Sequence, residues 1–87
     1  MLNQRYSSIV NTFHEYTYHI LGCGAIGSAA ATQLVRMGAL KLKLYDRDEV
    51  NNENLGVSMF RIADIGMSKP KALMSICLTI NNNVNIE

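Results

Sequence analysis

The chain has 87 residues, fewer than the roughly 100–150 of a typical domain, so it holds one domain at most. Apolar residues make up 48% of it and the net charge is +1, which excludes a disordered tail and a basic nucleic-acid-binding surface. No apolar run is long enough to span a bilayer, and the first 15 residues are too polar for a signal peptide. The two cysteines form no Cys-x-x-Cys pair, so we expect a protein of the reducing cytoplasm without a zinc site.

The first half of the chain predicts a helical segment, a strand and a longer helix. Apolar side chains recur at helical spacing in residues 1–15, which predicts an N-terminal helical segment. Aromatic and β-branched residues predict a strand over 16–21, and a helix is expected over 25–37. The apolar stripe expected to face the core of that helix consists of Ile26, Ala29, Ala30, Leu34 and Met37.

The second half continues the alternation of strands and helices. Leucine and lysine alternate over 40–45, which predicts a strand with one buried and one polar face. Residues 46–68 are expected to be mostly loop. A second helix is predicted to begin near Pro70 with Ser68 as its N-cap, and residues 84–87 alternate as a third strand.

This order, βαβαβ, predicts an α/β fold: a Rossmann-like half with a three-stranded parallel sheet. Right-handed crossovers place both helices on one face if the strand order is 3-2-1. Because parallel sheets are normally covered on both faces, we expect further chain, the N-terminal segment or a partner subunit on the second face. Residues 1–87 are therefore predicted to form a single domain that is part of a larger protein or assembly.

A glycine-rich turn between the first strand and the first long helix indicates a phosphate-binding loop. Gly22 allows a sharp turn off the strand, Gly24 allows a phosphate to approach the backbone, and Gly27 allows the helix to sit close to the strand. The N-terminus of the helix then offers N–H groups and a positive dipole end to an anion.

An acidic residue at the end of the second strand complements this loop. Asp46 lies 19 residues beyond Gly27, where a carboxylate can accept hydrogen bonds from both ribose hydroxyls of a nucleotide. The alternative is an exposed aspartate that opens a turn. An acid at this position also disfavours a 2′-phosphate and therefore NADP.

The residues that follow distinguish a dinucleotide site from an ATP site. They read Asp46-x-Asp48-x-Val50, then an Asn54-Leu55 pair, then Ile65-Gly66-Met67-Ser68-Lys69-Pro70-Lys71-Ala72. In this order and at these intervals, the motifs over about residues 18–87 resemble the ThiF/MoeB/HesA family. Its members are adenylating enzymes that activate ubiquitin-like and sulfur-carrier proteins.

The resemblance implies a reaction and a role for each residue of the motifs. The carboxylate of the partner's C-terminal glycine attacks the α-phosphate of ATP, used with Mg²⁺, and pyrophosphate leaves. Asp46 would bind ribose, Asp48 would shape the loop or lie near the nucleotide, and Asn54 would bind a phosphate oxygen. Lys71 would offset phosphate charge and, with Asn54, act in catalysis. The phosphates would lie on a loop made of Gly22, Gly24, Ala25, Ile26 and Gly27.

The two lysines of this region have a second interpretation that needs no nucleotide. Lys69 and Lys71 fall in the first turn of the second helix, where they either are solvated or face an anion. Cations are unfavourable near a helix N-terminus, which favours the anion.

Departures from the family pattern point to a chain that is incomplete for catalysis. The family's Asn-Leu-x-Arg-Gln lacks its arginine and glutamine here, where Gly56-Val57-Ser58 stands, and Arg61 is the candidate to replace that arginine. The family's metal-binding aspartate and carrier-binding surface correspond to positions beyond residue 87, so no metal ligand is predicted. We expect the ATP-binding part of an adenylating enzyme, working as a homodimer or with a second chain. The alternatives are a non-catalytic adenine-nucleotide-binding module and, less favoured, a fragment of an NAD-binding oxidoreductase.

Overall fold

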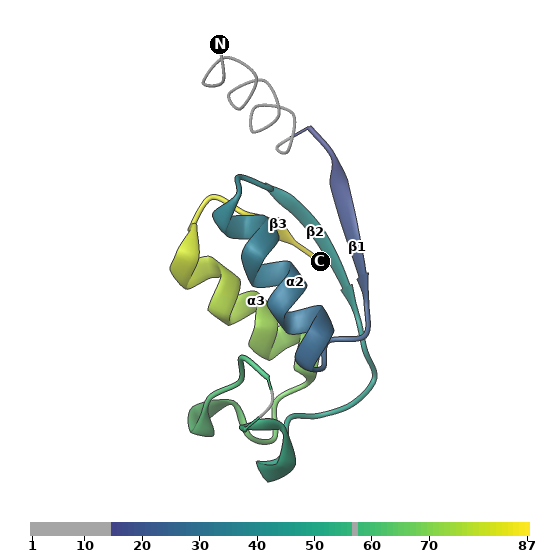
Figure 1. Ribbon diagram of the computed structural model, residues 1–87, viewed down its shortest axis with the longest axis vertical. Coiled ribbons are helices and arrows are strands. Elements are labelled where there is room, and N and C mark those ends of the chain that lie inside the picture. Colours follow the sequence, from purple (N-terminus) through teal and green to yellow (C-terminus); the bar gives the residue numbers. More distant parts are fainter. Residues whose placement is uncertain (1–14, 57) are drawn as a thin grey trace.

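Strands and helices alternate along the chain in the predicted order (Figure 1). The computed structural model describes residues 15–56 and 58–87, so the helical segment predicted over 1–15 lies almost entirely outside the described residues. The elements are β1 (Thr17–Leu21), α2 (Ala25–Arg36), β2 (Lys41–Tyr45), the short 3₁₀ turns η1 (Asn52–Asn54) and η2 (Ile62–Asp64), α3 (Lys69–Ile80) and β3 (Asn85–Ile86).

The three strands form one parallel sheet in the order β1-β2-β3, which confirms the predicted topology. The pairing of β1 with β2 runs from Thr17 opposite Lys41 to Leu21 opposite Tyr45. Both helices lie on the same face of this sheet (Figure 1). No helix in residues 15–56 and 58–87 has the length and apolarity needed to cross a membrane.

The predicted core-facing stripe of α2 is wrong in its position. Ile26 is 88% exposed, and Ala29 and Ala30 are exposed too. Leu34 is the one member of the stripe that packs partly against the core. The buried face of α2 consists of Ser28, Ala31, Thr32 and Val35.

There are two physical reasons why the buried face of α2 differs from the predicted one. A Cβ atom on Gly27 would lie 1.8 Å from the carbonyl oxygen of Gly22, so the helix packs closely on the end of β1 through that glycine. The residues on the side of the helix that Gly27 brings to the sheet, Ser28, Ala31, Thr32 and Val35, therefore face inward. The polar ones can be buried because the helix satisfies them: Ser28 Oγ donates to the carbonyl of Ala25, and Thr32 Oγ1 donates to that of Ser28.

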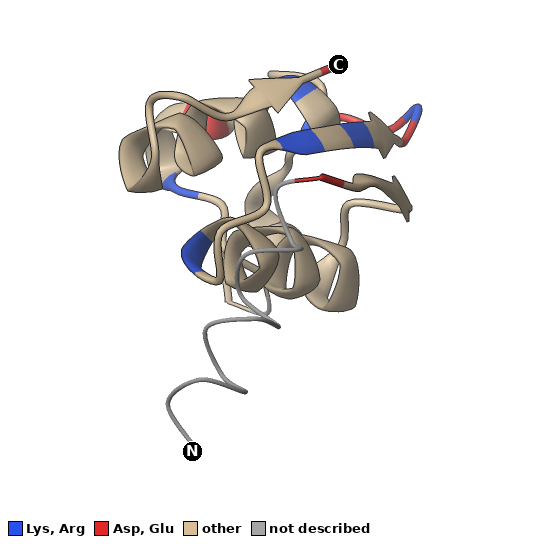
Figure 2. Ribbon diagram, turned by 90° about the horizontal axis from the view of Figure 1, so that it is seen from above, with Lys and Arg blue, Asp and Glu red and all other residues tan. Residues whose placement is uncertain are grey.

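The core fills the space between the helices and the sheet. It includes Leu42 and Leu44 of β2 and Leu73, Ile76 and Cys77 of α3. The opposite face of the sheet is polar: Figure 2 shows the lysines of β2 as blue bands along the strand. There the Lys43 ammonium lies 3.5 Å from the carboxylate of Glu87.

Candidate functional site

The predicted site residues gather at one end of the molecule. The carboxyl ends of β1 and β2, the N-termini of α2 and α3 and the segment 46–68 all lie there (Figure 1). Gly22 and Asp46 directly follow neighbouring parallel strands, and the Gly22 N–H donates to the carbonyl of Tyr45 at 2.7 Å. Ligands of parallel α/β sheets bind at this edge.

The three glycines have separate structural reasons to be glycine. Gly22 has a φ angle of +95°, a conformation that residues with a side chain rarely adopt. A Cβ on Gly24 would have no atom within 4 Å, so the backbone there faces open space. Gly27 is the residue through which α2 packs against the end of β1. A hollow of about 530 Å³ lies over this loop, lined by Leu21, Gly22, Gly24, Ala25, Ile26 and Gly27.

The two helices differ in how their N-termini are satisfied. Helix α3 is capped by Ser68, whose Oγ accepts the N–H of Lys71 at 3.3 Å. Helix α2 begins after Gly24 with no side-chain cap and no acidic residue in its first turn. The first N–H groups of a helix have no partner within it. The N-terminus of α2 therefore presents free donors and an uncompensated dipole to an anion.

Asp46 connects the glycine loop to the end of β2. Its Oδ2 accepts the N–H of Cys23 at 2.8 Å and its Oδ1 accepts the N–H of Asp48 at 2.9 Å. Burial raises the pKa of this carboxyl, but these two N–H groups and the charges of Lys69 and Arg47 outweigh it. The pKa of Asp46 is therefore lower than usual, and the side chain is an anion at neutral pH.

Lys69 is the first-turn lysine whose charge acts on the site. It lowers the pKa of Asp46 and opposes the rise in the pKa of the Cys23 thiol. Its backbone N–H donates to the carbonyl of Asp48 at 2.9 Å. Lys71 is exposed and is not among the charges that act on Asp46. The spacing Ile65-Gly66-x-x-Lys69 is the sequence signal that would have favoured Lys69.

Asn54 and Asp48 both contribute to local turns. The Asn54 Oδ1 accepts the N–H of Asn51 at 2.8 Å and so completes the cap of η1. Its Nδ2 group donates to no other residue in the described part of the chain, and a phosphate oxygen requires such a donor. Asp48 has an exposed side chain, and its main chain bonds both Asp46 and Lys69.

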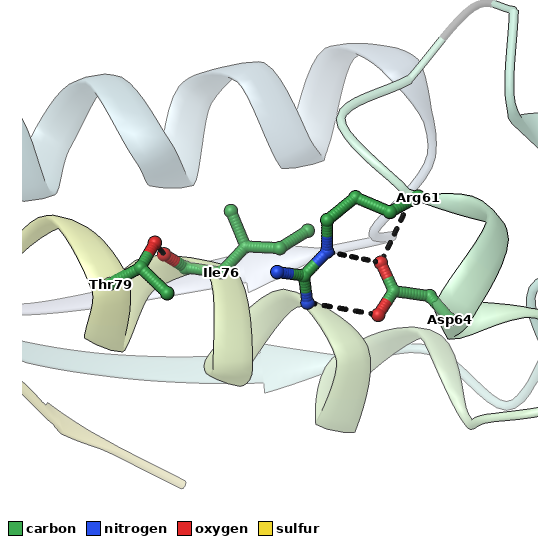
Figure 3. Close-up of polar contacts among 4 residues, drawn as sticks. All are labelled: Arg61, Asp64, Ile76 and Thr79. Carbon is green, nitrogen blue, oxygen red and sulfur yellow. Dashed lines mark hydrogen bonds and ion pairs between the residues drawn. The ribbon is translucent and has the colours of Figure 1, made fainter.

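Arg61, the candidate replacement for the missing family arginine, is engaged elsewhere. Its Nε donates to Asp64 Oδ2 at 3.1 Å and its Nη2 donates to Oδ1 at 3.0 Å, which makes a two-pronged ion pair (Figure 3). The Asp64 side chain is only 2% exposed. The guanidinium therefore neutralises a buried carboxylate within η2 and its N-cap.

The cysteine within the glycine loop is a buried packing residue. Cys23 and Cys77 are both free thiols with no exposed surface. Burial raises the pKa of each thiol to about 11, so neither is a thiolate near neutral pH. Within residues 15–56 and 58–87, no three His, Cys, Asp or Glu side chains are grouped to hold a metal ion.

Comparison with known sequences identifies relatives over most of the chain. The model of the ThiF family matches residues 8–87. Ubiquitin-like modifier-activating enzyme 5 of Oryza sativa subsp. japonica is 38% identical over 73 residues, which are 84% of this chain and 17% of that protein. The enzyme of the same name from Dictyostelium discoideum is 41% identical over 68 residues, 78% of this chain and 18% of that protein. The chain thus spans about a fifth of the length of these relatives.

Solved structures give the same answer for the fold. The crystal structure of E. coli MccB with ATP superposes with a TM-score of 0.86 at 26% identity, covering 91% of this chain and 24% of that one. E. coli tRNA N6-threonylcarbamoyladenosine dehydratase, TcdA, superposes with a TM-score of 0.84 at 24% identity, covering 88% of this chain and 32% of that one. The TcdA likeness is one of fold alone.

Proposed function

The chain belongs to the ThiF family, and on that premise we propose that its glycine loop binds the phosphates of ATP. The observation that carries the proposal is the N-terminus of α2, which is uncapped and open beside Gly24. Asp46 and Lys69 flank the loop with one negative and one positive charge. The crystal structure of E. coli MccB with ATP, 26% identical to this chain, supports the choice of ATP over NAD.

Each side chain of the site then has a task that its surroundings permit. The anionic Asp46 accepts the ribose hydroxyls, since each carboxylate oxygen has a second lone pair beyond the one used by the main chain. The Nδ2 group of Asn54 donates to a phosphate oxygen. Lys69 offsets phosphate charge, and Lys71 stays the candidate that the family resemblance names for the same task. Asp48 shapes the turn that holds Asp46.

We further propose that the chain is the ATP-binding part of an enzyme that adenylates the C-terminus of a ubiquitin-like or sulfur-carrier protein. Adenylation needs the carboxylate, the α-phosphate and the leaving pyrophosphate to be aligned, and positioned donors supply most of the rate. The residues named above position phosphate and ribose. Mg²⁺ would accompany the ATP, and we name no ligand for it among the described residues.

A second copy or another chain is the proposed partner that completes the domain. What supports this is an exposed apolar surface beside the loop, with Leu21 81% and Ile26 88% exposed. Strand β1 lies at the edge of the described sheet, where its outer side is open to a further strand. Light scattering at micromolar concentration tests the homodimer. A monomeric mass would rule out the homodimer and leave a different chain as the proposed partner.

Titration calorimetry of the chain with ATP·Mg²⁺ and with NAD tests the nucleotide. We expect heat of binding with ATP and none with NAD, and NAD binding without ATP binding would overturn the proposal. Pyrophosphate exchange with ubiquitin-like proteins ending in glycine then separates an adenylating enzyme from a nucleotide-binding module, which would bind ATP without exchange.

Lys69→Gln and Lys71→Gln form a matched pair for the phosphate contact, because both remove one charge from the same helical turn. We expect Lys69→Gln to weaken ATP binding about tenfold and Lys71→Gln to change it much less. The reverse order would assign the contact to Lys71.

A further inference from the structure

Asp46 is bonded to the main chain at both of its carboxylate oxygens, through contacts internal to the protein. The N–H of Cys23, which donates to Oδ2 at 2.8 Å, belongs to the glycine loop. The N–H of Asp48, which donates to Oδ1 at 2.9 Å, belongs to the turn after β2. One side chain thus joins two segments that are 23 residues apart in the sequence.

The same turn is joined to the start of α3. The carbonyl of Asp48 accepts the N–H of Lys69 at 2.9 Å, and Glu49 pairs with Ser68 in an antiparallel bridge. A continuous series of hydrogen bonds therefore runs from Cys23 through Asp46 and Asp48 to Lys69. In this series Asp46 is the only residue that takes part through its side chain, and the other residues take part through main-chain atoms.

The flexibility of the glycine loop means that its shape depends on such hydrogen bonds. Glycine residues have the largest conformational freedom to lose, so a glycine loop holds its N–H groups in place only when other contacts fix it. Hydrogen bonds to a carboxylate are roughly twice as strong as those between neutral groups. The bond from Cys23 lies between Gly22 and Gly24, at the centre of the loop.

We propose that Asp46 is a positioning residue that holds the glycine loop in its phosphate-binding shape, independently of any contact with ribose. This inference rests on the proposed ATP site and adds to it. It predicts that Asp46 matters for a ligand that has phosphates and no ribose.

Binding of inorganic tripolyphosphate and of ATP to the Asp46→Asn chain, measured by calorimetry, tests the proposal. Simple electrostatics predicts tighter binding of tripolyphosphate, because the substitution removes a negative charge near the loop. If Asp46 acted on ribose alone, the substitution would not weaken the binding of tripolyphosphate. Positioning predicts that tripolyphosphate binding weakens about tenfold, as for the loss of one charge-assisted hydrogen bond.

Glu49→Gln is the matched control, because it removes the same charge from an exposed side chain three residues away. We expect it to leave tripolyphosphate binding unchanged or slightly tighter. Unchanged or tighter binding by Asp46→Asn as well would overturn the proposal while leaving the ribose contact in place. If Asp46→Asn does not fold, Asp46→Glu retains two acceptor oxygens at a shifted position, and weaker tripolyphosphate binding by it has the same meaning.

Amide hydrogen exchange tests the positioning without a ligand. In Asp46→Asn the Cys23 N–H is expected to exchange at least fivefold faster relative to the core N–H of Leu73, and in Glu49→Gln it is expected to keep its rate. An unchanged Cys23 rate would overturn the inference. If the unmodified chain binds neither ATP nor tripolyphosphate, the proposed function fails, and the Cys23 rate still decides the role of Asp46.

Discussion

Gly27→Ala is the substitution that most directly tests how α2 packs on the sheet. The added methyl carbon would lie 1.8 Å from the carbonyl oxygen of Gly22 and 3.3 Å from Cγ2 of Ile20. A carbon and a carbonyl oxygen normally approach to about 3.3 Å, so the start of the helix would have to retreat by about 1.5 Å. The neighbour is backbone, which cannot rotate away as a flexible side chain could.

The loss of stability caused by this displacement is partly offset by the higher helix propensity of alanine. Overpacking costs about 1–3 kcal/mol, and a clash with backbone belongs at the upper end of that range. Alanine is favoured over glycine within a helix by about 1 kcal/mol. A net loss of about 2 kcal/mol is large against the roughly 4–13 kcal/mol expected for a chain of this size.

Urea denaturation followed by far-ultraviolet circular dichroism measures this loss, and a melting temperature lower by about 8–16 °C is expected alongside it. Gly24→Ala is the control, because a Cβ there meets no atom within 4 Å and its cost is expected to stay below about 1 kcal/mol. Equal stability of Gly27→Ala and the unmodified chain would refute the close packing of α2 on β1.

The remaining predictions concern the loop, the buried ion pair and the thiols. Gly24→Ala, although nearly as stable as the unmodified chain, is expected to weaken ATP binding at least tenfold, because its methyl group occupies the open space where a phosphate approaches. Arg61→Ala leaves the buried Asp64 without its ion pair and is expected to lower the free energy of unfolding in urea. The Arg61 hydrogen bond holds the pKa of Asp64 below its ordinary value of 3.8, so the stability that this carboxylate adds is complete near neutral pH. That stability is lost as the pH falls from about 4 through the lower, folded-state pKa. Urea titrations at neutral and acid pH should therefore show a smaller acid loss in Asp64→Asn, and an equal loss would contradict this contribution. Cys23 and Cys77 are expected to react with a thiol reagent at pH 8 only on the timescale of unfolding, since both are buried with pKa values of about 11; rapid labelling of the folded chain would contradict their burial.

The sequence by itself determined the order of the elements and the topology of the sheet. Alternation in β2 and the turn residues around Gly22 and Ser68 are local patterns, and local patterns predict local structure. Short parallel crossovers then allow only a few arrangements of three strands. The glycine loop and Asp46 could be predicted as candidates for the same reason, because the residues that the motif requires are near one another in sequence or follow adjacent strands.

The tertiary structure alone decided which face of α2 is buried. Apolar spacing favoured the stripe that begins at Ile26, and the close approach of Gly27 to Gly22 turned the helix so that Ser28 and Thr32 face the core. Hydropathy cannot anticipate this, because the hydroxyl groups are satisfied by carbonyls of their own helix.

The tertiary structure also decided the partners of Asp46. The contact with the Cys23 N–H joins residues 23 positions apart, and the charge of Lys69, not that of Lys71, reaches the carboxylate. Both facts depend on how the turn after β2 meets the start of α3. The sequence therefore identified the residues that we propose to bind a phosphate and a ribose, and the packing of the two helices on the sheet determined which of them lie together.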